Sequence, residues 1–241
     1  MDILILRFDA PLMSFGGVMV DQHGPIDRFP GLAMLTGLLA NALGYRHGDF
    51  DRLQALQTRI RFAARWDVEP ERVIDYHTVD LGQEKMRHPG WTTRGEAEHR
   101  AGGPDARLGT HQRYRHYWAN GVMTLAVTLE NENTPTLDEL EAALRHPARP
   151  LFLGRKTCLP AAPLALAQTR ADNLLEALCS CPLHPRTVGK AGESLAACWP
   201  ADVSGGLHAR IVSRYDQREW RNQIHAGRRD HHEGRIRRPA S

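Results

Sequence analysis

The chain has 241 residues, of which 41% are hydrophobic and 24% charged, so it is too apolar for a disordered protein and predicts one large domain or two small ones. The longest run without charge, residues 29–45, contains proline and glycine and is shorter than the ~20 apolar residues that a bilayer requires. No membrane segment or secretory signal is expected. Four cysteines are too few for a disulfide scaffold, and we expect a cytoplasmic protein.

The net charge is only +3, but the positive charge is concentrated in two segments. Residues 85–118 contain seven Lys or Arg and three acids, and residues 207–241 contain nine arginines and four acids. Between these two segments, residues 119–147 carry five acids and one arginine. This segregation is typical of a protein that meets a polyanion along part of its surface.

In the first part of the chain, the apolar run 3–6 predicts a central strand covered on both faces, followed by a Pro/Gly turn at 10–17. Leucines at helical spacing predict a helix over 32–43. Residues 59–66 alternate between apolar side chains and mostly arginine, which predicts a half-buried strand with an arginine face.

The second part continues with strands, a helix and a long hairpin. Expected strands are 73–79, 111–118, 122–129, 151–153, 164–166 and 207–215, with helices over 136–145 and beyond residue 170. The resulting order is the βαββαβ pattern of a ferredoxin-like or RNA-recognition-type α+β domain. We therefore expect a ferredoxin-like domain over 1–170 that includes a hairpin at about 73–118, and a smaller β-rich extension over 171–241 with an arginine-rich tail.

Basic and aromatic residues interleave in the expected strand that contains His111, Arg113, Arg115 and Tyr117. The two arginines and Tyr117 would share one face, where phosphates could be paired and a base stacked. Alternatively, Tyr114 and Trp118 are core residues and the arginines form a solvated face; the pattern alone favours neither. If the strands of the hairpin pair, Tyr76 or His77 would lie beside the arginines.

Two further patterns could bind phosphate or metal. Arg155 and Lys156 follow a glycine, so backbone amides and cations could converge on a phosphate, although an ordinary exposed turn is the simpler interpretation. Zinc could be held by Cys179, Cys181 and His184, but the spacing is not the paired form and a structural role for reduced thiols is favoured. The histidine-containing end of the chain is interpreted as a solvated tail (His225, His231, His232, Glu233). No metal or cofactor is expected.

Five stretches together resemble a known family. They are LRFDAPLMSFGG near the N-terminus, LTGLLANALG with Tyr45 and Arg46, DYHTV, RYRHYWANG, and LFLGRKTCLPAAPL, in this order within residues 1–166. They resemble the CasD family, the subunits of type I-E CRISPR Cascade that hold the 5′ handle of the crRNA. The resemblance implies a ferredoxin-like domain whose hairpin is a protruding thumb. It places these residues near the RNA: Ser14, Gly16, Arg28, Arg46, Tyr76, His77, His111, Arg113, Arg115, Tyr117, Arg155 and Lys156.

The resemblance also implies partners, namely crRNA, a CasC-like backbone subunit, a CasA-like large subunit and, through the complex, target DNA. In this interpretation the chain is a non-catalytic clamp and base pairing of the guide supplies sequence specificity. The alternative is a metal-independent endoribonuclease that processes repeat RNA, as in the type I-C relative, with Tyr76, His77 and Lys156 as candidate acid and base groups. An RNA-binding module that acts alone is disfavoured by the acidic stretch 130–141.

Overall fold

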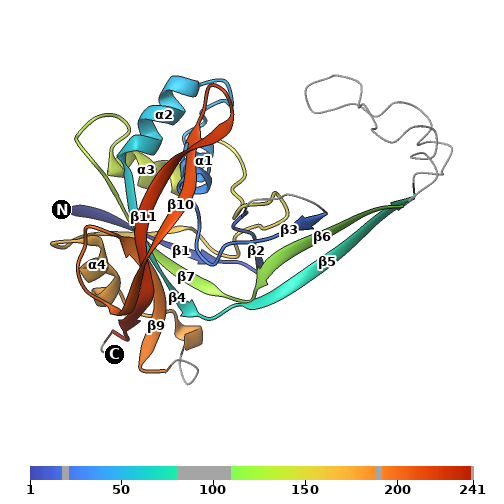
Figure 1. Cartoon of the computed structure of the whole chain (residues 1–241). Helices are drawn as coiled ribbons and strands as arrows, with labels where there is room; N and C mark the ends of the chain where they lie inside the picture. Colours follow the sequence, from blue (N-terminus) through green and yellow to red (C-terminus); the bar gives the residue numbers. More distant parts are fainter. Residues whose placement is uncertain (18–21, 81–109, 188–191, 240–241) are drawn as a thin grey trace.

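The computed structural model describes residues 1–17, 22–80, 110–187 and 192–239 (Figure 1). The strands are β1 (Asp2–Asp9), β2 (Leu12–Met13), β3 (His23–Gly24), β4 (Ile60–Val68), β5 (Glu71–Asp80), β6 (Thr110–Ala119), β7 (Val122–Leu129), β8 (Ala165–Arg170), β9 (Ser194–Pro200), β10 (Leu207–Glu219) and β11 (Ile224–Arg237). The helices are α1 (Leu32–Ala42), α2 (Phe50–Arg59), α3 (Leu137–Arg145) and α4 (Leu174–Ser180), with a 3-10 turn at Pro185–Thr187. No helix within these ranges is long and apolar enough to cross a bilayer.

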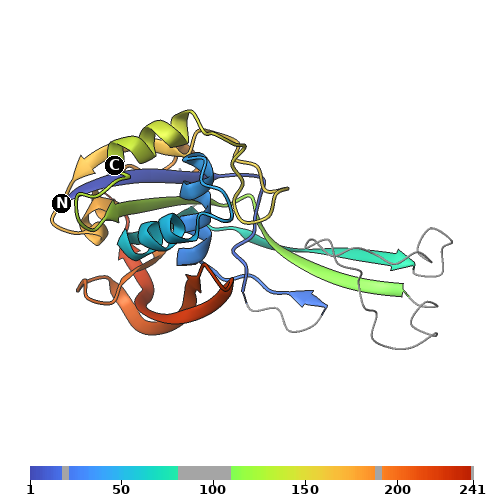
Figure 2. The same cartoon turned by 90° about the horizontal axis from the view of Figure 1, so that it is seen from above.

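The architecture is mixed α+β with a large antiparallel sheet. Seven strands lie in the order β10-β11-β9-β4-β7-β1-β8, and every neighbouring pair is antiparallel. A smaller sheet joins β2, β3, β5 and β6. Its two long strands, β5 and β6, extend away from the body as a twisted two-stranded ribbon, called here the projecting ribbon (Figures 1 and 2).

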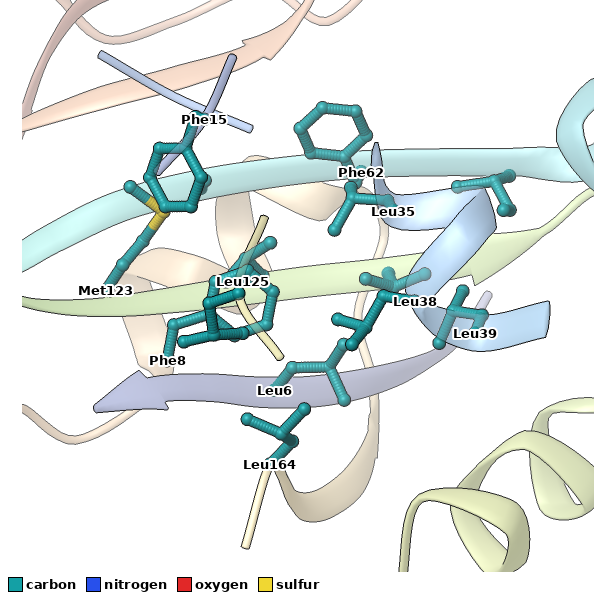
Figure 3. Close-up of a cluster of buried hydrophobic side chains, with 14 of the residues drawn as sticks. Leu6, Phe8, Phe15, Leu35, Leu38, Leu39, Phe62, Met123, Leu125 and Leu164 are labelled. Atoms are coloured by element: carbon teal, nitrogen blue, oxygen red, sulfur yellow. The ribbon is translucent and has the colours of Figure 1, made fainter. Parts of the chain in front are cut away.

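Strand β1 is covered on both faces, as its apolar run predicts. Leu6 and Phe8 pack with leucines of α1 on one side of the main sheet (Figure 3), whereas Ile3 and Ile5 pack with α4 on the other side. The two apolar layers explain why β1 reads as a continuous hydrophobic run rather than an alternating one. The expected helices over 32–43 and 136–145 and both expected hairpin strands are also present.

The expectation of a half-buried strand at residues 59–66 is wrong, because both faces of β4 are covered. Arg65 has no exposed side-chain surface and donates from Nε to Asp67 Oδ1 (2.7 Å), with further donation to the Cys181 carbonyl (2.7 Å). The Asp67 carboxylate also accepts from the hydroxyl of Thr124 (2.9 Å). Helix α4 and the segment after it cover this face, so the arginine is buried with its hydrogen bonds satisfied rather than solvated.

Two more sequence interpretations fail. Residues 151–153 are irregular rather than a strand. The short strand expected at 164–166 is present as β8, which begins at Ala165 and continues to Arg170. The interpretation of the C-terminal segment as a solvated tail is wrong, since its residues form β11, which pairs with β9 and β10. His231 is 1% exposed and its Nε2 bonds to Glu233 (3.1 Å).

The long hairpin of β10 and β11, called here the C-terminal hairpin, runs beside α1 and α2 (Figure 1). Gln57 on α2 fixes its tip: the buried amide donates to the Arg218 carbonyl (2.9 Å) and accepts from the Arg218 amide (3.1 Å) and Trp220 Nε1 (3.2 Å). One side chain therefore satisfies two backbone groups and an indole, and it ties the hairpin to the helix.

We predict that Gln57→Leu lowers the free energy of unfolding by about 1–3 kcal/mol, because buried polar groups of Arg218 and Trp220 lose their partner while the volume is kept. Urea denaturation of the full chain measures this difference. Thr58→Ala, at the exposed neighbouring position, is the control and should change stability by no more than about 0.5 kcal/mol. An equal effect of the two substitutions would contradict the docking role of Gln57.

A second prediction concerns acid stability. The hydrogen bond from His231, together with Arg214, outweighs burial and lowers the pKa of Glu233 to about 2 from its ordinary 4.5. A lowered folded-state pKa stabilises the fold above pH 4.5, and this contribution disappears as the pH falls towards 2. The stability difference between wild type and Glu233→Gln should therefore be largest above pH 4.5 and shrink towards pH 2 in urea titrations. A difference independent of pH would contradict this, and the exposed Glu132→Gln serves as control.

Candidate nucleic-acid interface

A cleft of about 570 Å³ lies along one face of α1. Segments far apart in the sequence supply its lining: the turn after β1, helix α1 with the loop that follows it, the 149–155 segment, and the C-terminal hairpin. Of the residues predicted near RNA, Ser14, Gly16, Arg46 and Arg155 line it. The structure thus brings together four predicted site residues that are separated by up to 141 positions in the chain.

The wall at residues 153–158 is fixed against the first turn by a close backbone approach. The Ser14 amide donates to the Leu153 carbonyl (3.0 Å), and Gly154 has φ +94°. A Cβ on Gly154 would lie 1.7 Å from the Ser14 carbonyl oxygen, so only glycine fits. The glycine turn that the sequence predicts before Arg155 is therefore a requirement of the packing.

Arg155 is held at the base of the projecting ribbon. Its Nη1 donates to the His116 carbonyl (3.0 Å), and its guanidinium carbon lies 4.7 Å from the centroid of the Tyr117 ring. Tyr117 is only 4% exposed, so the expectation that it stacks a base is wrong in this structure: its ring is part of the core and Arg155 lies over it. Tyr117 instead positions the arginine through a cation–π contact.

The cleft lining is rich in basic side chains. They are Arg46, His47, Arg149, Arg155, Arg218 and His225. Its two acids, Asp27 and Asp216, already have arginine partners: Asp216 accepts from Arg229 (2.6 Å), and Asp27 lies 3.7 Å from Arg214. None of the four lining arginines has an acidic partner within the described ranges, so the cleft favours an anionic ligand.

The two faces of the projecting ribbon carry different side chains. Cross-strand pairing places His77 opposite Arg113 and Asp75 opposite Arg115, so these lie on one face with Tyr117, as expected. Arg115 is exposed and Arg113 half-buried, and neither forms an ion pair with a described residue. His77 Nε2 lies 2.5 Å from Asp75 Oδ2.

Tyr76 lies on the opposite face, where it pairs with Tyr114. The rings of Tyr76 and Tyr114 are 4.9 Å apart, and Tyr114 stacks on His23 at 4.6 Å with 11° between the planes. Tyr76 is 51% exposed, so the outer end of this aromatic column is open. The pairing therefore puts His77, and not Tyr76, beside the arginines.

The remaining predicted residues lie outside the cleft lining. Arg28 is exposed and pairs with Glu69 (2.7 Å), and Lys156 is exposed beside Arg155. The backbone of His111 pairs with Val79 in the projecting ribbon. The tip of the expected hairpin, residues 84–108, lies outside the described residues.

Among described residues, no group of three His, Cys, Asp or Glu side chains is arranged to hold a metal ion. His116 is buried, and burial together with the nearby Arg72 lowers its pKa; Arg72 donates to its Nδ1 (2.7 Å). The imidazole of His116 is thus kept neutral inside the ribbon base.

A family model described as CRISPR-associated protein (Cas_Cas5) matches residues 3–232 of this chain. The chain belongs to this family. A relative from Escherichia coli (strain K12), "CRISPR system Cascade subunit CasD", is 32% identical over 183 residues, which cover 73% of this chain and 75% of the relative. The resemblance to CasD is therefore confirmed.

Two solved structures share the fold of this Cas5-family chain. A chain of a "CRISPR RNA-guided surveillance complex" matches with a TM-score of 0.69 and 24% identity, over 99% of this chain and 91% of that chain. A "Crystal structure of Cas protein" matches with a TM-score of 0.62 and 22% identity, over 98% and 95% of the two chains. Both matches extend through the C-terminal hairpin as well as the N-terminal part.

Sequence reasoning assigned no RNA contact to several cleft residues of this Cas5-family chain. Among them are His47, Arg149, Phe152, Arg218 and His225, the last of which was interpreted as part of a solvated tail. His47 follows the predicted Arg46 directly, and the strand expected at 207–215 continues as β10 to Glu219 and so includes Arg218. Arg149, whose guanidinium donates to the Tyr45 carbonyl (2.6 Å), lies in an irregular segment without any pattern.

We predict that Gly154→Ala destabilises the Cas5-family fold by more than about 2 kcal/mol, since the left-handed backbone is strained for alanine and the added methyl meets Ser14. Gly16→Ala is the matched control, because a Cβ there meets nothing within 4 Å. Thermal and urea unfolding of both variants should separate them clearly. Equal stability would show that the 153–158 turn can move away from Ser14.

Proposed function

We propose that this chain is the subunit of a type I-E Cascade that binds the 5′ handle of the crRNA and does not cut it. The observation that carries the proposal is the cleft, which gathers Ser14, Gly16, Arg46 and Arg155 with lining arginines that have no acidic partner among the described residues. Arginine forks without a competing carboxylate bind phosphates well. The Cascade subunit CasD from E. coli, 32% identical, supports the same assignment.

The projecting ribbon supports a role in assembly. Its cationic face, with Arg113 and Arg115, suits the phosphates of the same RNA, whereas Ile74 and Tyr76 on the other face are 54% and 51% exposed. Apolar surface on a two-stranded ribbon favours burial against another subunit. We propose CasC-like and CasA-like subunits as protein partners, target DNA as a partner through the complex, and a cytoplasmic location.

The proposal includes an elaborated ferredoxin-like core over residues 1–170 and a C-terminal extension over 171–241. The strand order β4-β7-β1-β8, with α1 between β1 and β4 and α3 between β7 and β8, supports the ferredoxin-like assignment. In this arrangement the projecting ribbon is a thumb inserted between β4 and β7.

A nuclease role for the chain is disfavoured by the separation of its candidate groups. A general acid and base must converge on one phosphate. Tyr76 and His77 lie on opposite faces of the projecting ribbon, and His77 is already paired with Asp75. Lys156 belongs to the separate 153–158 turn.

The test is to incubate the full chain with labelled repeat RNA in EDTA and to score binding and cleavage separately. We expect handle binding without cleavage, and a weakening of at least tenfold in the Arg46→Gln, Arg155→Gln double variant. The slope of log affinity against log salt should become shallower by about 1.4, because each lost phosphate contact contributes about 0.7 for single strands. Arg170→Gln, an 84% exposed arginine paired with Asp2, is the control.

A steric variant tests the cleft without changing its charge. A Cβ on Gly37 of α1 meets nothing within 4 Å, so Gly37→Leu projects into the cleft while Gly37→Ala adds only a methyl. Leucine should weaken handle binding and alanine should not. Equal affinity for the handle and a scrambled RNA would contradict the proposal, and specific cleavage that His77→Ala abolishes would make the chain a processing enzyme.

A further inference from the structure

The C-terminal hairpin supplies a second wall to the cleft. Asp216 and Arg218 of β10 line it, together with Trp220, which directly follows the strand. His225 of β11 also lines it and is the cross-strand partner of Arg218. The pairing places Arg218 and His225 side by side on the hairpin, facing a cleft whose other lining includes Arg46 and Arg155.

Arg218 is held in place, but one of its side-chain donors has no acceptor in the described part of the chain. Its backbone amide and carbonyl are fixed by Gln57, and its Nη2 donates to Gln223 Oε1 (2.5 Å). The guanidinium carbon lies 5.4 Å from the centroid of the Trp220 ring. The Nε atom is nevertheless buried with no hydrogen-bond partner among the described residues.

Arg218 is half-buried and lines the cleft, so its side chain suits an anionic ligand there. Arg218 has no acidic partner in the described ranges, whereas Asp216 on the same face is neutralised by Arg229 (2.6 Å). The strand face therefore presents a cation without an internal counter-charge.

We propose that Arg218 and His225 bind a phosphate of the RNA from the side opposite Arg46 and Arg155, so that the C-terminal hairpin closes the handle-binding cleft. This inference rests on the proposed function and adds residues to its site. The RNA strand would run along the small side chains of α1, Ala33 and Gly37 among them, with cations on both sides. The extension beyond residue 170 then takes part directly in RNA binding.

The experiment compares two variants of the second wall with matched controls on the same hairpin. Arg218→Gln removes the fork, and Arg228→Gln removes a 58% exposed arginine that does not line the cleft. His225→Glu adds a negative charge at an exposed cleft position, and Ile224→Glu adds one at the exposed neighbouring residue outside the lining. His225→Glu keeps the test valid if Arg218→Gln impairs folding.

We expect both cleft variants to lower the affinity for labelled handle RNA at least fivefold, with a shallower salt dependence for Arg218→Gln, while both controls stay within twofold. A 4-thiouridine handle should also cross-link to the 218–225 segment of the wild type. Wild-type binding that Arg46→Gln and Arg155→Gln weaken, but that Arg218→Gln and His225→Glu leave unchanged, would overturn this inference alone. Absence of wild-type handle binding would overturn the proposed function and this inference with it.

Discussion

Helix α1 begins after Gly31, whose lack of a side chain leaves the first helical amides without a local cap. Asp216 of β10 supplies the missing acceptor: its carboxylate accepts a hydrogen bond from the Leu32 amide (2.9 Å) and another from Arg229 (2.6 Å). Burial raises the pKa of this carboxyl, but the Arg229 hydrogen bond and charge outweigh it and hold the pKa below its usual range. Because the cap comes from a distant strand, folding of the C-terminal hairpin and the position of α1 are coupled. The cleft between them depends on this contact.

The charge balance of the cleft follows from the same network. Arg214 binds Glu233 (2.9 Å) and the Phe29 carbonyl (2.9 Å), and it lies 3.7 Å from Asp27. The acids around the N-terminus of α1 are therefore used inside the protein, whereas Arg46 and Arg155 in the lining have no acidic partner there. A phosphate that binds in the cleft therefore does not have to break an ion pair of Arg46 or Arg155, so its attraction to these arginines is not offset by that loss.

Local pattern was enough to predict several elements and one turn. Strand β1, helix α1 and the projecting ribbon all follow from apolar runs, helical spacing or aromatic alternation, and the turn before Arg155 follows from Gly154. What failed depended on long-range cover. Arg65 was predicted to be solvated because nothing in the local sequence shows that α4 will lie over it. Tyr117 was predicted to stack a base because the local sequence does not show that Arg155, 38 positions away, lies over its ring. Arg218 and His225 required the pairing of two strands that the sequence alone did not reveal.

The projecting ribbon shows why one element can serve two kinds of contact. At its base β6 pairs with β2 and β3, and Trp118 Nε1 donates to the Asp27 carbonyl (2.7 Å), so the body supports the ribbon there. Further out it has no second layer among the described residues, and a two-stranded ribbon is marginally stable in water. The aromatic column of Tyr76, Tyr114 and His23 adds stacking along one face, while strand alternation sends Arg113 and Arg115 to the other. Because the pleat separates the two sets, a single ribbon could contact a protein surface with one face and RNA phosphates with the other, as the proposed role in a Cascade complex requires.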